Sequence, residues 1–317
     1  MRRFLLLFFV STLAISCAEK SETTDFKKQS GLLSEHFSSL DNSTQKFEIS
    51  FDKPSLVKGE KGTIIHVVPE NLETENGKPI GSEIHVELKE LFTSDDFFRA
   101  NAPSISNGKM LLSGGEYFIG MTSNGNVLRV KRGKTIEVEF PRISTKRMEL
   151  FTADRDSLNR LNWSPANQKF KKQDGTENLL FDMNGNIVNT YDNDALADKY
   201  APMQLDYIGW IACGAFNRTE TPGDFEISFA DKKLTYAETY LIFKKTNSTL
   251  QLSTYFNGKD KMKFEKIPIE QEAELVCLAV KNGKLLKFKT QVDLTTQAKI
   301  EIVFKENQKN KINKTGH

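Results

Sequence analysis

The sequence predicts an all-β protein built from two antiparallel β-sandwiches behind a short N-terminal tether. Apolar and polar residues alternate with a period of two in short segments, for example at residues 47–51, 84–88, 136–140 and 300–304. Such alternation is typical of strands with one buried face and one solvated face. Six Asn-Gly pairs punctuate the chain, and both residue types tolerate the positive φ angles of tight hairpin turns.

The length and composition fit two globular domains. The chain has 317 residues, of which 38% are hydrophobic and 27% are charged, as expected for a folded protein and not for a disordered chain. At about 100–200 residues per domain, this length suggests two domains. The formal net charge of +2 gives no general attraction to a polyanion, so no nucleic-acid partner is predicted.

The first sixteen residues have the plan of a secretory signal peptide. A basic start precedes the apolar run FLLLFFV at residues 4–10, and the segment closes on Ser16-Cys17. The run is too short to span a bilayer. A signal that ends on a small residue followed by cysteine resembles a bacterial lipobox, which implies cleavage after Ser16 and lipidation of Cys17. The alternatives are an ordinary signal peptide with Cys17 nearby by chance, or a cytoplasmic chain with an apolar start.

The mature chain divides according to its periodicity. Residues that follow Cys17 are rich in Ser, Thr, Lys and Glu without a sustained period, which is typical of a tether. The strand patterns are interrupted by a long polar stretch of poor periodicity, which predicts a connection between two domains. The predicted parts are a signal peptide (1–16), a lipidated tether (17–45), a first β-sandwich (46–145), a connector (146–205), a second β-sandwich (206–306) and a polar tail (307–317).

Few segments of this sequence have the pattern of a helix. Residues 90–101 are predicted to hold a short helix with Ser94 as its N-cap. Residues 192–200 are predicted to hold another, which Pro202 would end. The rest of the chain is therefore expected to be strands and turns.

A series of motifs in residues 62–141 carries a family resemblance. They are Gly62-Thr63, Pro69, Asn76-Gly77-Lys78-Pro79, Gly81, Glu90, Ser113-Gly114-Gly115 and Thr122-Ser123-Asn124-Gly125. In this order they resemble an N-terminal module of surface lipoproteins of the Bacteroidetes, and the segment is distantly similar to the ZU5 β-sandwich. Gly209-Trp210-Ile211 resembles a strand found further along in the same lipoproteins, although Ala212 and Gly214 replace its usual Asn and Asp. The resemblance implies Ig-like or ZU5-like sandwiches in a largely uncharacterised family, and no catalytic residue.

Two cysteines remain besides Cys17. Cys213 and Cys277 both lie in apolar, strand-like runs. In an oxidising envelope compartment, a disulfide between them is one prediction, and loop entropy would make it worth about 4 kcal/mol. The alternative is two buried thiols that pack as small hydrophobic side chains.

No metal ion or other cofactor is predicted. His66 and His85 fall in predicted strands, where exposed sheet histidines are the commoner interpretation. The Asn- and Asp-rich segments 182–186 and 192–194 lack the glycine and distal glutamate of a calcium loop, so they are predicted to be turns. Asp156-Ser157-Leu158 resembles the short O-glycosylation acceptor of exported Bacteroidetes proteins, which makes Ser157 a candidate glycosylation site.

The sequence therefore predicts a protein anchored to the outer membrane by lipid, with a binding or structural role and no enzymatic activity. None of the common nucleophile, zinc-protease or phosphate-loop motifs is present. The acidic start at residues 18–22 resembles tethers of surface-exported lipoproteins, which favours the cell surface over the periplasmic face. The expected partners are the membrane, through the anchor, and a glycan or an envelope protein. The alternative function is an envelope hydrolase that acts on polysaccharide or peptide.

Overall fold

The structure is a computed structural model. Some predicted features lie outside the residues that it describes: most of the signal peptide, the polar tail, Ser157, and the segments 182–186 and 192–194. The described residues are 15–156, 159–171, 179–181, 187–189, 199–219, 221–255 and 261–304.

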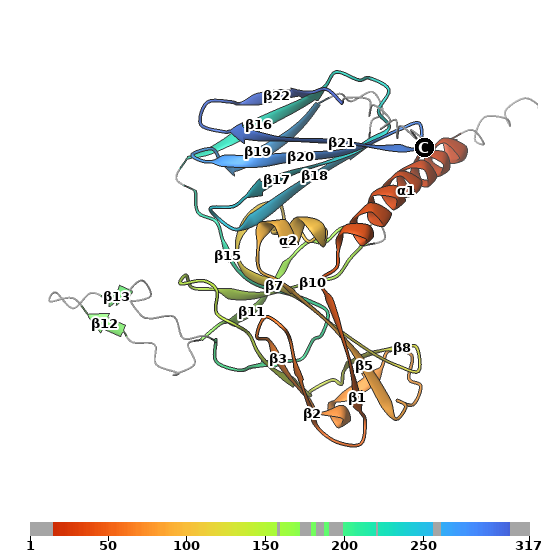
Figure 1. Cartoon of the computed structure of the whole chain (residues 1–317), viewed down its shortest axis with the longest axis vertical. Coiled ribbons are helices and arrows are strands. Elements are labelled where there is room, and N and C mark those ends of the chain that lie inside the picture. The colour runs from red at the N-terminus through yellow and green to blue at the C-terminus, as the bar shows by residue number, and fades with distance from the viewer. Residues whose placement is uncertain are drawn as a thin grey trace, which may run out of the picture.

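The prediction of an all-β protein with antiparallel sandwiches is confirmed, and the first sandwich is formed by two sheets (Figure 1). One sheet has the order β1 (Thr44–Ser50), β5 (Glu83–Leu91), β7 (Lys109–Ser123), β15 (Trp210–Phe216), β10 (Glu149–Ala153), β11 (Ser164–Lys169), with β4 (Leu72–Thr74), β6 (Ile105–Ser106) and β8 (Asn126–Val130) attached to it. The facing sheet has the order β14 (Met203–Leu205), β9 (Ile136–Glu139), β3 (Ile64–Val67), β2 (Ser55–Lys58). A single 3-10 turn, η1 (Pro69–Asn71), leads from β3 into β4.

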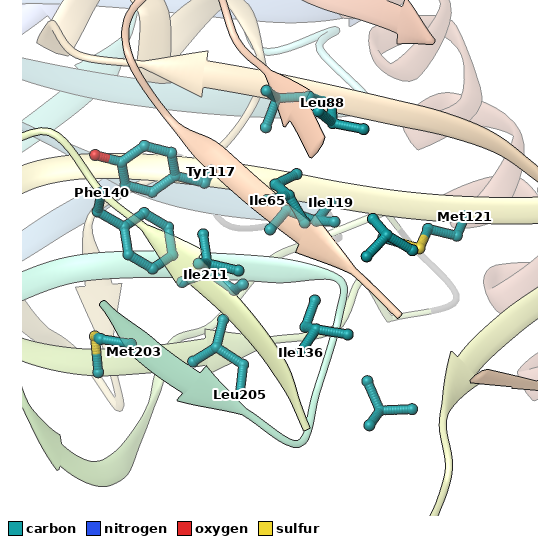
Figure 2. Packing of buried hydrophobic residues seen from close by; sticks show 14 of the residues in the cluster. Ile65, Leu88, Tyr117, Ile119, Met121, Ile136, Phe140, Met203, Leu205 and Ile211 are labelled. Atoms are coloured by element: carbon teal, nitrogen blue, oxygen red, sulfur yellow. The ribbon is translucent and has the colours of Figure 1, made fainter. Parts of the chain in front are cut away.

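Period-two alternation places the core of this sandwich. In β5, Ile84, Val86 and Leu88 are fully buried, whereas Glu83 and His85 point to solvent. Figure 2 shows the resulting core, in which side chains from β3, β5, β7, β9, β14 and β15 meet. Its labelled members are Ile65, Leu88, Tyr117, Ile119, Met121, Ile136, Phe140, Met203, Leu205 and Ile211.

Three of the predicted Asn-Gly turns have the backbone geometry that tight hairpins require. Asn107, Asn124 and Asn282 have φ angles of 48°, 50° and 50°. The glycine that follows each has a φ angle between 70° and 75°. Two successive residues with positive φ are typical of a type I′ turn, whose twist matches that of the flanking strands.

The second sandwich is also built from two sheets (Figure 1). Its sole parallel pairing among the described strands joins β16 to β22. Phe225, Leu241, Phe243 and Leu275 are fully buried between the sheets. The strand orders are β19 (Lys261–Pro268), β16 (Pro222–Phe229), β22 (Lys299–Ile302) in one sheet and β18 (Ser248–Tyr255), β17 (Tyr236–Phe243), β20 (Glu272–Lys281), β21 (Lys284–Asp293) in the other.

The predicted tether is wrong as a description of residues 17–45, because most of them form helix α1 (Ile15–Leu40). Leu33 and Phe37 lie four residues apart, hence on one helix face, and pack on Tyr236 and Tyr240 of β17. This contact buries β17 on both faces. A few apolar residues suffice to stabilise α1, because tertiary packing contributes more than intrinsic helix propensity to the stability of helices in proteins. No helix in the described part of the chain is long and apolar enough to cross a bilayer.

The predicted domain boundaries are also wrong. Strands β10, β11 and β14 lie in residues 146–205, which were expected to form a connector, and all three complete the first sandwich. Strand β15 was expected to open the second sandwich, but it pairs with β7 and β10 of the first. The physical reason is burial on both sides: the first five residues of β15 are all buried. Such strands lose the alternation on which the boundaries were based. A further hairpin joins β12 (Leu179–Phe181) to β13 (Ile187–Asn189).

Helix α2 (Ser94–Arg99) lies between the two sandwiches (Figure 1) and confirms the helix predicted within residues 90–101. Its N-cap is Thr93, one residue before the expected Ser94, and Thr93 and Asp96 form a capping box. Hydrogen bonds close the junction around it: Thr249 Oγ1 donates to Ser94 O at 2.9 Å, and Ser248 Oγ donates to Leu111 O at 2.6 Å.

Candidate functional site

A groove of about 760 Å³ lies beside this junction. The end of α1, the outer faces of β7 and β8, the loop after β10 and the loop before β15 form its walls. Its volume falls in the range of typical small-molecule sites, about 300–1,000 Å³. Segments that are distant in the sequence therefore converge on one concave surface.

Two glycines shape the floor of the groove. A Cβ atom at Gly120 of β7 would lie 2.8 Å from the ring of Phe118, so this ring packs directly over the glycine and fills the space of the absent side chain. Gly209 has a φ angle of 141°, which disfavours other residues, and the ring of Tyr207 folds back over it. The rings of Phe118 and Trp210 pack with centroids 5.2 Å apart. The floor is thus apolar and aromatic.

Arg155 holds one wall in place. Its guanidinium lies 4.6 Å from the centre of the Trp210 ring. Its two Nη atoms donate to the carbonyl oxygens of Asn101, Asn159 and Ala100 at 2.8, 3.0 and 2.8 Å. Burial lowers the pKa of Arg155 to about 10, so the side chain remains cationic at neutral pH. Its hydrogen bonds tie the loop after β10 to the end of α2.

Some of the charged side chains that line the groove form ion pairs, and others do not. Asp41 forms an ion pair with Lys89. Burial acts to raise the pKa of Asp41, but hydrogen bonds from Lys89 and Ser43 outweigh it and hold that pKa below its usual value. Arg129 pairs with Glu73 at 2.9 Å.

Three further carboxylates line the same groove: Glu75, Asp154 and Asp206. None of them has a cation within ion-pair distance in the described part of the chain. Asp154 accepts a hydrogen bond from the Tyr207 hydroxyl at 3.0 Å. Together with Asp41, four carboxylates line the groove, against the three cations Lys89, Arg129 and Arg155, so its formal charge is −1.

Two carboxyl groups with raised pKa values lie elsewhere. Burial raises the pKa of Glu238, although hydrogen bonds from Tyr236, Tyr240 and Gln251 oppose the shift. Burial also raises the pKa of Glu116 well above its usual value. Neither residue lines the groove. Both carboxyl groups with raised pKa values therefore lie outside the groove lining.

The two histidines are not brought together. His66 on β3 contacts Glu139 of β9, with 2.9 Å between Nε2 and Oε1. His85 lies on β5, in the other sheet, and its Nδ1 is 3.6 Å from Oε2 of Glu48. Glu48, Glu83 and His85 could hold a metal ion, because one ligand atom from each lies within 4.8 Å of the others; all three are exposed.

The predicted disulfide is wrong. Cys213 and Cys277 are both free and buried, and they belong to the cores of different sandwiches. Burial raises the pKa of each thiol to about 12. The alternative prediction, buried thiols that pack as small hydrophobic side chains, is confirmed.

This burial predicts the reactivity of the thiols. In a chain that carries Cys17→Ala, we expect a thiol reagent such as dithionitrobenzoate to label neither cysteine in the native protein and both in guanidinium chloride without reductant. A buried, protonated thiol is a poor nucleophile, whereas unfolding exposes it. Labelling of no thiol after unfolding would instead indicate a disulfide.

Glu90, a position of the family resemblance, has a structural role. Its buried carboxylate accepts hydrogen bonds from the backbone N–H groups of Lys61 and Thr63 at 2.7 and 2.8 Å. It also accepts one from Gln45 Nε2 at 2.9 Å. Glu90 therefore organises the loop before β3 and lies apart from the groove.

The sequence did not indicate most of the groove residues. Trp210 was singled out within its motif, but Tyr207, Asp154, Arg155 and Asp206 carried no signal of their own. Ser16 and Cys17 lie within the bounds of α1. A scan against protein-family models, a search of curated proteins and a search of solved structures each found no match for this chain.

Proposed function

We propose that this protein is a lipid-anchored binding protein of the bacterial outer membrane, exposed at the cell surface and without enzymatic activity. We place its ligand in the groove. The observation that carries this proposal is the lining of the groove: an aromatic floor in which the rings of Phe118 and Tyr207 are partly accessible, with carboxylates beside it that have no cationic partner in the described chain. Ligand sites are typically apolar concavities with a few polar groups that fix orientation.

The anchor and the groove are connected through α1. Ser34, Phe37 and Asp41, at or just beyond the end of this helix, line the groove. Cys17 lies near its start. At 1.5 Å per residue, the helix would place Cys17 about 25 to 35 Å from the groove residues at its other end. Membership in the Bacteroidetes surface lipoproteins, with Ig-like or ZU5-like modules, is part of the same proposal and rests on the sequence motifs.

The alternative functions are less well supported. An envelope hydrolase would favour carboxyls of raised pKa in the groove, whereas Glu116 and Glu238 lie outside its lining. Attachment facing the periplasm would use the same anchor, and the location experiment separates the two faces.

The test of the location is membrane fractionation combined with protease treatment of intact cells. We expect the wild-type chain to sediment with the outer membrane and to be cut from outside. Cys17→Ala is expected to be released from the membrane and to lack the mass of the lipid, because that lipid is its sole proposed attachment. Ser21→Ala serves as the matched control and should behave as the wild type. A Cys17→Ala chain that stays membrane-bound with unchanged mass would contradict the anchor, and protection of the wild type would assign the periplasmic face.

A further inference from the structure

We infer that the groove binds a cationic side chain, lysine or arginine, of a peptide or protein partner. This inference rests on the proposed binding function and chooses between its two expected partners, an envelope protein and a glycan. The groove combines three features on one surface: unpaired carboxylates, an aromatic floor and an exposed apolar rim.

The first feature is charge complementarity. The cations that line the groove are already engaged: Lys89 with Asp41, Arg129 with Glu73, and Arg155 with three carbonyl oxygens. The carboxylates of Glu75, Asp154 and Asp206 face the same space without a cationic partner in the described chain. Such a surface attracts a cation and repels an anion.

The second feature is the aromatic floor. Tyr207 and Phe118 are half-buried, so part of each side chain remains accessible in the groove. A guanidinium or ammonium group over such a ring is attracted to its negatively charged face. Arg155 on Trp210 is an example of this contact within the groove itself.

The third feature suits the aliphatic part of a long basic side chain. Val127 of β8 lines the groove and is 51% exposed, and Ile208 lies half-buried in the same lining. Lysine and arginine bury their methylene stems on apolar surface while their charged ends reach polar partners. A neutral sugar would use the rings but would leave the three carboxylates without compensating charge.

The experiment is isothermal titration calorimetry of the full chain with four defined probes: tetra-arginine amide, tetraglutamate, cellotetraose and chitotetraose. We expect tetra-arginine alone to bind, more weakly at higher salt concentration. The double variant Asp154→Asn/Asp206→Asn should weaken its binding by about tenfold or more, since each lost charge contact typically changes affinity several-fold. Asp52→Asn/Glu60→Gln, which removes two exposed charges outside the groove, is the matched control and should bind as the wild type.

The outcomes separate the two proposals. Equal binding of tetra-arginine to the wild type and the double variant would overturn the cationic site, since the attraction would then be non-specific. Binding of a tetrasaccharide that is lost in Tyr207→Ala would overturn the cationic site but support a binding function in the groove. Binding of none of the probes would count against both. Unfolding temperatures of all variants, compared with the wild type, verify that each is folded.

Discussion

Replacement of Trp163 by alanine is expected to lower the free energy of unfolding by about 3–5 kcal/mol, the usual cost of truncating a buried aromatic residue. The side chain is fully buried, and its Nε1 donates to Pro103 O at 2.9 Å. It packs edge-on against Trp210, with 6.5 Å between ring centroids. Truncation would open a cavity between the first sandwich and the region of helix α2, and it would leave Pro103 O with the backbone N–H of Ile105 as its remaining donor.

The measurement is urea unfolding followed by circular dichroism. Trp163→Phe should cost less than Trp163→Ala, because it keeps most of the ring, and it provides a value if the alanine variant does not fold. Gln168→Ala, at an exposed position of β11, is the control and should change the free energy by less than about 0.5 kcal/mol. If both Trp163 variants matched this control, residues 146–205 would behave as the solvated connector that the sequence predicted.

The strands that could be predicted from the sequence are those with one buried face and one solvent-exposed face. Exposed and buried residues alternate over the first six residues of β5, and the same alternation of polar and apolar residues can be seen in the sequence. β15 is buried on both faces over its first five residues, and β17 over its whole length. Polar and apolar residues therefore do not alternate regularly along these strands. The boundary error followed from this, because β15 pairs with β7, a partner about a hundred residues earlier that local patterns cannot reveal.

The groove could not be predicted because it depends on tertiary placement. Its floor depends on Gly120, on which the ring of Phe118 packs directly, and on Gly209, whose backbone conformation makes room for Tyr207. Its charge depends on which carboxylates lack partners, and the partners of Asp41 and Arg129 lie 48 and 56 residues away in the chain. Trp210 could be singled out from its sequence motif, whereas the other residues that line the groove could be identified only from the folded structure.

Replacement of Glu116 by glutamine is expected to make the protein less sensitive to rising pH. Glu116 is 1% exposed on β7, where Ser104 Oγ donates to its Oε1 at 2.9 Å. Its Oε2 is buried without a hydrogen-bond partner in the described chain. Burial therefore raises the pKa of Glu116 well above its usual value, although Ser104 and the charge of Arg155 act in the opposite direction.

The sign of the effect follows from proton linkage. Between the pKa of the unfolded state, about 4.3, and the raised pKa of the folded state, the native protein holds a proton on Glu116 that the unfolded chain has lost. The stability that this proton contributes is complete below the unfolded-state pKa and is lost as the pH rises through the folded-state pKa. Its loss amounts to up to about 1.4 kcal/mol per pH unit in that window. Glutamine imitates the protonated carboxyl and cannot lose this proton.

The difference in unfolding free energy between Glu116→Gln and the wild type isolates this group, because other titrating residues, Glu238 among them, are common to both chains. We expect the difference to grow in favour of the variant as urea unfolding is repeated from pH 4 to pH 8. Glu60→Gln, at an exposed position, should give a difference that is constant over the same range. A constant difference for Glu116→Gln as well would mean that the carboxyl is ionised in the folded protein. The protein would then have to stabilise a buried negative charge, to which the positive charge of Arg155 contributes.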